Sequence, residues 1–138
     1  MELADTSAWG SRHRLSHEAR LELKRQIEGG DIATCSAVKH ELLYSARNLD
    51  DFRERRAVID ALRHCPIGQE EWERAFDVYE LLAGRGGAHH RGVPFNDLLI
   101  AAAAESAGVP VLHYDRHFER IAEVTGQPVR AIAPLGSL

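Results

Sequence analysis

Cysteine, excess positive charge and long apolar runs are all scarce in this chain of 138 residues. Its two cysteines, Cys35 and Cys65, have no CxxC or Cys/His ligand spacing, which argues against a zinc site or a disulfide framework, so we expect buried, reduced thiols. With a net charge of −4, contact with RNA or DNA would need a local basic patch. No apolar run approaches membrane-spanning length and no leader pattern begins the sequence, so we expect a cytoplasmic protein without a membrane partner.

The composition that remains is that of an ordinary globular protein, with 44% hydrophobic and 28% charged residues. A chain of this length can bury one full core but not two large ones. We therefore expect one domain over residues 1–138.

Apolar periodicity predicts strands that alternate with helices. The predicted strands cover residues 2–5, 31–38, 109–115 and 128–134. The predicted helices cover residues 6–28, 39–48, 49–65, most of 66–84, 94–108 and 116–126. Such alternation favours an α/β fold, with a twisted parallel sheet flanked by helices on both faces.

Two local features of the predicted helices carry further expectations. The helix within residues 66–84 has a stripe at helical spacing, which we expect to face the core: Trp72, Phe76, Tyr79 and Ala83, with Leu82 beside them. Ser36 is available to cap the helix that follows it.

The stretch PFNDLLIAAAAESAG, residues 94–108, places one carboxylate, Asp97, before seven consecutive apolar residues. A helix that is apolar all the way round is buried on most sides, so Asp97 is expected at the mouth of the core. Two interpretations remain open. Either Asn96 or Asp97 caps the helix, or the Asp97 carboxylate points into a site that requires negative charge.

Three further acids accompany Asp97. Asp5 and Asp115 end predicted strands, and the active residues of parallel sheets gather beyond the carboxyl ends of strands. Glu41 borders an apolar arc and can reach the edge of the core; the arc consists of Val38, Leu42, Ala46 and Leu49. As alternatives, Asp5 and Asp115 can cap the helices after them, and Glu41 can be a solvated helix acid.

If the four acids converge, their mutual repulsion calls for a neutralising cation. An oxygen-only ligand set suits Mg²⁺ or Mn²⁺ rather than zinc.

Four segments, in this order and spacing, resemble the PIN-domain ribonucleases, and most closely the VapC-type toxins of toxin–antitoxin pairs. They are LADTSAW (3–9), SAVKHELLYSARN (36–48), PFNDLLIAAAAESAG (94–108) and VLHYDRHFERIA (111–122). The resemblance implies a PIN-like fold in which Asp5, Glu41, Asp97 and Asp115 form the metal-binding catalytic quartet. It implies that Thr6 or Ser7 helps to order water at the metal, and we add Asn96 as a further supporting residue.

The implied function is that of a toxin, an Mg²⁺-dependent ribonuclease that hydrolyses RNA phosphodiester bonds, accepts Mn²⁺ and is inhibited by a cognate antitoxin. Relatives also form homodimers, for which the amphipathic helices between Leu49 and Leu82 offer apolar surface. Candidate phosphate contacts, which can equally be solvated surface charges, are Arg12, His13, Arg14, Arg85, His89, His90 and Arg91. Trp9 can stack on a base or pack the first helix.

The chain departs from the family pattern at two histidines. His113 occupies a position where many relatives carry Thr or Ser, and some relatives carry a further acid near His117. Both departures lie at the fourth-acid end of the site, where a second metal would bind.

Other function classes remain as alternatives. A non-catalytic PIN-like module that binds RNA or protein would be favoured by loss of an acid, and none is lost. A phosphatase with an aspartyl nucleophile needs an acid where Ser7 stands. A receiver domain needs an acid pair and a late lysine, whereas the lysines here, Lys24 and Lys39, are both early.

Overall fold

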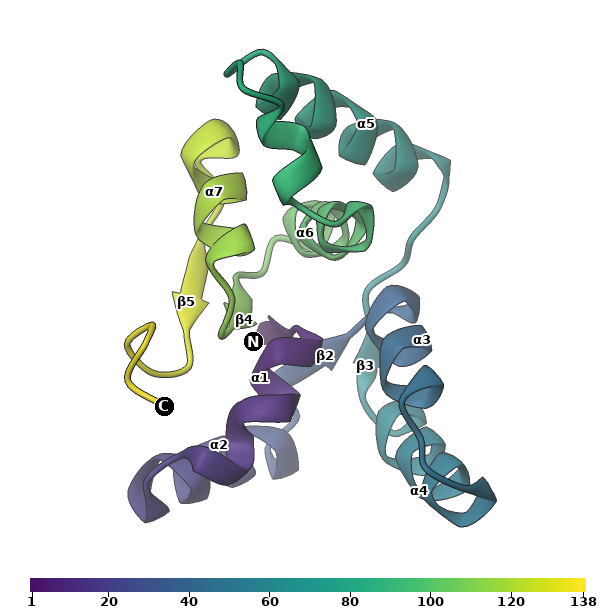
Figure 1. The fold of residues 1–138 in the computed structure, drawn as a ribbon. Helices are drawn as coiled ribbons and strands as arrows, with labels where there is room; N and C mark the ends of the chain where they lie inside the picture. Colours follow the sequence, from purple (N-terminus) through teal and green to yellow (C-terminus); the bar gives the residue numbers. More distant parts are fainter.

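The computed structural model describes residues 1–138 and contains a five-stranded parallel sheet flanked by helices (Figure 1), which confirms the predicted fold class. The strands are β1 (Glu2–Ala4), β2 (Ile32–Thr34), β3 (Arg63–His64), β4 (Val111–His113) and β5 (Val129–Ala131). The α-helices are α1 (Thr6–Ser11), α2 (His17–Glu28), α3 (Ser36–Tyr44), α4 (Leu49–Asp60), α5 (Gln69–Ala83), α6 (Phe95–Ala107) and α7 (Arg116–Thr125). Two short 3₁₀ helices are η1 (Arg12–Arg14) and η2 (His89–Gly92).

The strand order is β3-β2-β1-β4-β5, and every neighbouring pair is parallel. From β1 the chain proceeds outward through β2 to β3, whereas from β4 it proceeds in the opposite direction to β5. The order therefore reverses between β1 and β4, which are hydrogen-bonded neighbours with Leu3 opposite Val111. Ligands of open α/β sheets bind at the carboxyl ends of the strands at such a reversal, because the loops there diverge and leave a crevice.

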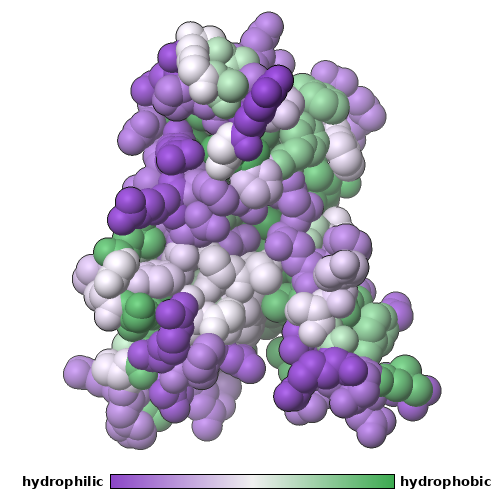
Figure 2. Space-filling view, viewed as in Figure 1, coloured by the Kyte–Doolittle hydropathy of each residue, from purple (hydrophilic) through white to green (hydrophobic).

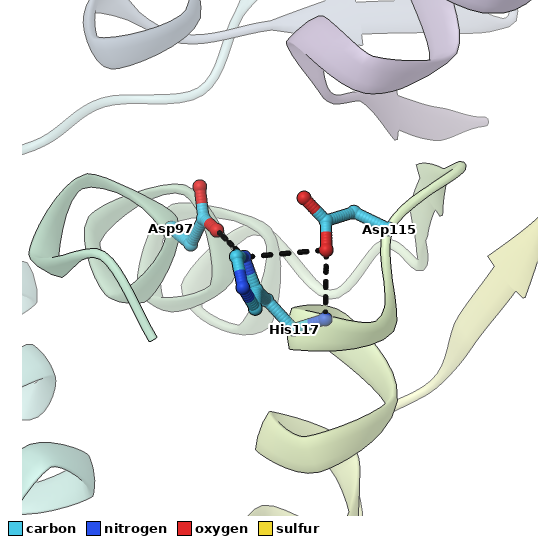
Figure 3. A group of neighbouring side chains, drawn as sticks. All are labelled: Asp97, Asp115 and His117. Carbon is cyan, nitrogen blue, oxygen red and sulfur yellow. Dashed lines mark hydrogen bonds and ion pairs between the residues drawn. The ribbon is translucent and has the colours of Figure 1, made fainter. Parts of the chain in front are cut away.

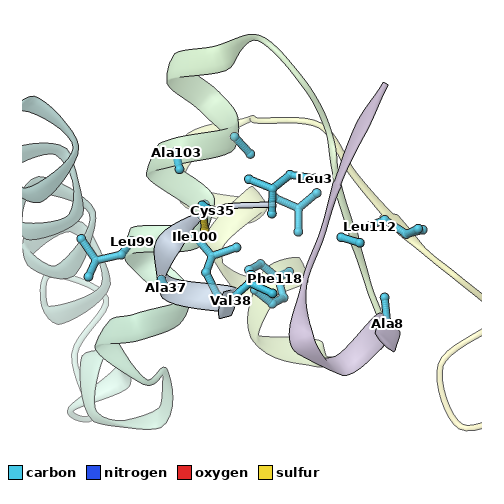
Figure 4. Close-up of a cluster of buried hydrophobic side chains, with 14 of the residues drawn as sticks. Leu3, Ala8, Cys35, Ala37, Val38, Leu99, Ile100, Ala103, Leu112 and Phe118 are labelled. Carbon is cyan, nitrogen blue, oxygen red and sulfur yellow. The ribbon is translucent and has the colours of Figure 1, made fainter. Parts of the chain in front are cut away.

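The core is one cluster of 27 buried residues from the sheet and the helices around it. Leu3, Ile100, Leu112 and Phe118 are fully buried in it, and Figure 4 shows side chains of β1, α6 and β4 gathered together. Every residue of α6 from Asp97 to Ala104 is buried, as expected for a helix apolar all the way round. Cys35 and Cys65 are buried and free, as predicted.

The predicted single helix over residues 6–28 is wrong. The chain forms α1 and η1, extends at Leu15, and then begins α2 at His17. Ser16 restarts the helix because its Oγ accepts the N–H of Ala19 at 3.2 Å. Periodicity alone missed this break because Leu15 is buried, as Leu23 of the following helix is.

The middle of the chain also differs from the predictions. β2 ends at Thr34, so the predicted strand over 31–38 is too long, and α3 already begins at Ser36. Ser36 is thus the first helical residue, and the cap position belongs to Cys35, which makes no side-chain cap bond. The predicted helix over 49–65 ends at Asp60, and the two residues of β3 follow it.

Two predictions of burial are wrong as well. The buried face of α5 consists of Ala75, Val78 and Leu82, and the aromatic stripe lies beside it. Trp72 is 42% exposed and Phe76 is 50% exposed. Leu49, assigned to the arc beside Glu41, begins α4 and is exposed. None of the helices is both long enough and apolar enough to cross a membrane.

Candidate active site

Asp5 leaves β1 with its side chain buried, only 3% exposed. One carboxylate oxygen, Oδ2, caps α1 by accepting the backbone N–H of Ser7 at 2.9 Å and the Ser7 hydroxyl at 2.6 Å. The other oxygen, Oδ1, is buried and has no hydrogen-bond partner. The predicted cap is therefore present, but it uses only one of the two carboxylate oxygens. A buried carboxylate oxygen without a donor is costly unless a cation approaches it.

Asp97 lies in the first turn of α6 but does not cap it. The helix begins at Phe95, and the cap position falls on Pro94, so the capping interpretation is wrong for both Asn96 and Asp97. The Asp97 carboxylate turns toward the neighbouring helix, and its Oδ2 lies 2.9 Å from Nδ1 of His117. The carboxylate lies among the other acids, and a role for it in a site stays a prediction.

Glu41 reaches this corner from α3. Its carboxylate accepts a hydrogen bond from Nδ2 of Asn96, which also lies 3.4 Å from the carbonyl oxygen of Ala37. Asn96 therefore connects α3 to the start of α6 and orients Glu41. Oxygens of Asp5, Glu41 and Asp97 all lie within 4.8 Å of one another.

Asp115 joins the site together with a residue that sequence reasoning did not assign to it. Asp115 Oδ1 caps α7 by accepting the backbone N–H of His117 at 3.0 Å, and it lies 3.2 Å from Nδ1 of the same residue. Figure 3 shows the side chains of Asp97 and Asp115 meeting at the His117 imidazole, with the second oxygen of each carboxylate directed away from it. The sequence signal that could have identified His117 was its position two residues after Asp115, at the start of a predicted helix.

His113 and Ser7 fix the strand ends around these acids. Nδ1 of His113 accepts the backbone N–H of Asp115 at 3.1 Å, and its Nε2 lies 3.0 Å from Oε1 of Glu119. The Ser7 hydroxyl accepts the backbone N–H of Tyr114 at 2.9 Å. Ser7 therefore links the end of β1 to the end of β4, the two strands at which the sheet order reverses. Thr6 makes no such link, since its hydroxyl is buried without a partner.

Burial and neighbouring charge raise the pKa of two of these acids, Asp97 and Asp5. Burial, and next the charge of Asp5, raise the pKa of Asp97 from 3.8 to about 7, against the lowering effect of His117. Burial also raises the pKa of Asp5, with a smaller contribution from Glu41, although the hydrogen bonds from Ser7 oppose it. The protein thus concentrates more negative charge here than it can neutralise by itself.

These residues fit a divalent cation. Two groups of ligand atoms share Asp97, one with Asp5 and Glu41 and the other with Asp115 and His117. The unpartnered Oδ1 of Asp5 and the raised pKa of Asp97 are both what an oxygen-rich cation site shows in the absence of its ion.

The basic residues named from the sequence belong to two segments, the start of the chain around η1 and the loop before α6. Arg12 stacks over Trp9, with 5.6 Å from its guanidinium carbon to the ring centre, and Arg14 lies similarly over Tyr114. In the loop before α6, Arg85 pairs with Glu123 and His90 packs against Tyr79. Trp9 is 8% exposed, so it packs the first helix rather than offering a face to a base.

Comparison with known proteins agrees with this geometry. The PIN domain model matches residues 3–124. The chain belongs to the PIN-domain family. It is 41% identical over 138 residues to Ribonuclease VapC18 of Mycobacterium tuberculosis, covering 97% of this chain and 96% of the relative. It is 56% identical over 117 residues to Ribonuclease VapC2 of the same species, covering 83% of this chain and 82% of that one.

Solved structures share the fold of this PIN domain. DNA-bound VapBC from Salmonella typhimurium has a chain with a TM-score of 0.71 at 20% identity, covering 96% of this chain and all of that one. VapBC-5 from Mycobacterium tuberculosis has a TM-score of 0.59 at 21% identity, covering 94% and 95%.

Proposed function

We propose that this chain is the toxin of a toxin–antitoxin pair, a ribonuclease that hydrolyses RNA phosphodiester bonds in the cytoplasm with Mg²⁺ as its cofactor. The decisive observation is the convergence of Asp5, Glu41 and Asp97, with an unpartnered buried oxygen among them, where the sheet order reverses. The similarity to VapC ribonucleases supports RNA as the substrate.

Each acid has a distinct part in this proposal. Asp5 and Asp97 are the main metal ligands, because each is buried and leaves the end of a rigid element. Glu41, oriented by Asn96, and Asp115 complete the site through water, a second ion or proton transfer. When bound, Mg²⁺ supplies charge neutralisation at the scissile phosphate and activation of the attacking water, and Mn²⁺ is expected to replace it.

A pocket beside α1 is the candidate place for the RNA backbone. A pocket of about 440 Å³ lies between α1 and the α3–α4 pair, and its charged lining consists of Arg12, His13, Arg47 and Arg55 together with Asp51 and Glu54. Arg47 and Arg55 both pair with Asp51, so Arg12 and His13 are the basic residues of this pocket without an acidic partner. Trp9 and Leu42 also line it, one helical turn after Asp5 and one residue after Glu41. Arg12 and His13 can hold RNA phosphates in this pocket, one helical turn from Asp5 along the chain.

The activity is tested by incubating the purified full chain with RNA in Mg²⁺, in Mn²⁺ and in excess EDTA. Cleavage is expected with either ion and not in EDTA. Asp97→Asn keeps the side-chain shape but removes charge at the site. The cleavage rate should therefore fall by about a hundredfold or more, which is the loss usual when one electrostatic stabiliser of the transition state is removed. Asp50→Asn, at an exposed acid of α4, is the matched control and should cleave normally.

Cleavage that persists in EDTA would contradict the metal requirement. RNA binding without cleavage under any ion would instead favour the non-catalytic module.

We also propose an antitoxin partner that lays a segment with a basic side chain across the acids. Arg suits this role because its planar fork can bond two carboxylate oxygens at once. The structural neighbours are VapBC complexes, which supports such a partner. Co-expression with the product of an adjacent small reading frame should yield a stable complex that does not cleave RNA, and failure to co-purify would count against the partner.

A further inference from the structure

His117 places a nitrogen atom, Nδ1 of its imidazole, among the carboxylate oxygens of the site. Its Nδ1 lies 2.9 Å from Oδ2 of Asp97 and 3.2 Å from Oδ1 of Asp115 (Figure 3). One ligand atom from each of the three residues lies within 4.8 Å of the other two. The side chain is 29% exposed, so an ion can reach the imidazole from solvent.

We propose that His117 binds a divalent ion directly through Nδ1, with Asp97 and Asp115, in a mixed nitrogen–oxygen position beside the all-oxygen position of Asp5, Glu41 and Asp97. The proposal rests on the metal site of the proposed function and adds a ligand to it. Its consequence is a preference for Mn²⁺ over Mg²⁺ that an all-carboxylate site would not have.

The spacing of the ligand atoms suits an octahedral ion. With metal–ligand bonds of about 2.1 Å, atoms at adjacent corners of an octahedron lie about 3 Å apart. The distances from His117 Nδ1 to the two carboxylate oxygens, 2.9 and 3.2 Å, match this edge.

A hydrogen bond alone satisfies this arrangement less well. Nδ1 carries at most one hydrogen, which cannot point fully at oxygens of Asp97 and Asp115 together. The Asp115 oxygen also already accepts the backbone N–H of His117 at 3.0 Å. A cation between the three atoms, by contrast, is attracted to all of them at once.

Ligand chemistry sets the ion preference. Mg²⁺ prefers oxygen ligands and keeps several waters, whereas imidazole is a common ligand of the later divalent metals. Mn²⁺ accepts carboxylates as Mg²⁺ does, but it is a transition metal and a softer ion, so it tolerates a mixed nitrogen–oxygen set better than Mg²⁺. A neutral imidazole also adds no negative charge, which weakens the attraction on which Mg²⁺ depends.

The test is Mn²⁺ binding to the full chain after EDTA treatment and dialysis, followed by pulsed electron paramagnetic resonance. We expect the bound Mn²⁺ to show coupling to a nitrogen nucleus. His117→Asp replaces the nitrogen donor with oxygen and should bind Mn²⁺ without that coupling. His13→Ala removes an exposed imidazole on η1 and should retain it.

Competition with MgCl₂ gives a second readout that is independent of cleavage. The ratio of Mn²⁺ to Mg²⁺ affinity should fall about tenfold or more in His117→Asp, the usual scale for changing a residue that supports a metal. Circular dichroism checks that the variant folds, and His117→Gln serves if it does not.

The outcomes separate this inference from the proposed function. Bound Mn²⁺ without nitrogen coupling in the unaltered chain would overturn the role of His117 and leave the ribonuclease proposal intact. An affinity ratio unchanged in a folded variant would do the same. If neither ion binds at millimolar concentration, the metal requirement of the proposed function fails as well.

Discussion

Asp97 is the residue at which folding and function conflict. It lies in the first turn of the most buried helix of the protein, yet its carboxylate faces Asp5 and Asp115, and its pKa is raised to about 7. Holding it there ionised costs stability that a cap or a surface ion pair would not cost. Such a local cost in stability is typical of sites whose excess negative charge is neutralised by a bound ligand.

The raised pKa predicts an unusual pH dependence for the metal-free protein. Because the folded state favours protonated Asp97, the free energy of unfolding should fall as pH rises from about 4 to about 7, and then level off. Asp97→Asn should flatten this slope and raise the Tm at pH 7.5 by at least about 4 °C, the scale expected for 1 kcal/mol in a domain of this size. The measurement is thermal unfolding in EDTA across this pH range.

Asp50→Asn provides the baseline for the other titrating groups. A parallel pH dependence in the Asp97 and Asp50 variants would contradict the assignment of the shift to Asp97.

Ser7 and Thr6 are neighbours, but only the Ser7 hydroxyl is hydrogen-bonded, so Thr6 serves as the control for Ser7. The Ser7 hydroxyl donates to Asp5 and accepts the N–H of Tyr114, whereas the Thr6 hydroxyl has no partner. Ser7→Ala should lower the free energy of unfolding by about 1 to 3 kcal/mol, because it leaves the Tyr114 N–H unpaired. Thr6→Val, which conserves shape, should change it by less than about 0.5 kcal/mol. Urea unfolding measures both, and equal losses would refute the distinction.

At the scale of elements, α6 explains why Asp97 can be held in place. α5 packs along it, and α3 and α7 contact it as well, so its apolar surface is covered on several sides. Arg74 of α5 reinforces this contact through two hydrogen bonds to Glu105, at 2.7 and 3.3 Å. A helix held on several sides cannot rotate to move Asp97 away from Asp5.

Substitution by alanine should have opposite effects on stability at two glycines, Gly108 at the end of α6 and Gly10 in α1. Gly108 ends α6 at φ +70°, a left-handed conformation that other residues adopt at a cost, while Gly10 lies in α1 with an ordinary φ. Neither position has an atom within 4 Å of an added Cβ. Gly108→Ala should therefore destabilise by about 1 kcal/mol, and Gly10→Ala should stabilise by about 0.5 to 1 kcal/mol. Urea unfolding with opposite signs is the expected result, and equal signs would rule out the backbone explanation.

At the scale of the whole molecule, the outer surface of α5 is apolar. Figure 2 shows hydrophobic side chains gathered at the upper right, where Figure 1 places α5. Trp72 and Phe76 contact Phe95 through their rings, at centre distances of 5.6 and 5.0 Å, yet both are about half exposed. A contiguous aromatic surface of this kind is typical of an interface.

We predict that a second copy of this chain covers this surface. The full chain should be a dimer at micromolar concentration by light scattering, and Phe76→Ser should shift it toward monomer because it removes apolar area at the centre of the patch. Leu21→Ser changes a residue of similar exposure on α2 and should leave the dimer intact. A monomer in the unaltered chain would refute the dimer and leave the nuclease proposal standing.

Much of the site was accessible from the sequence because its signals are local. Asp5 and Asp115 follow apolar strands, and both cap the next helix through contacts two residues away. The alternation of strands and helices likewise follows from apolar spacing within each segment, which predicts a parallel sheet. The resemblance to the family added Glu41 to the predicted site, because the residues around Glu41 in the sequence do not assign it a role by themselves.

Only the tertiary structure decided the remaining features, because each depends on contacts between segments distant in the sequence. β3 has two residues, too few for any periodic pattern, and exists because Cys65 and its neighbours pair with β2. The rotation of α5, which leaves Trp72 exposed, is set by its packing against α6. His117 joins the acids because α7 is placed beside α6 by the sheet, and no spacing within residues 111–122 specifies that Asp97, twenty residues earlier, meets its imidazole.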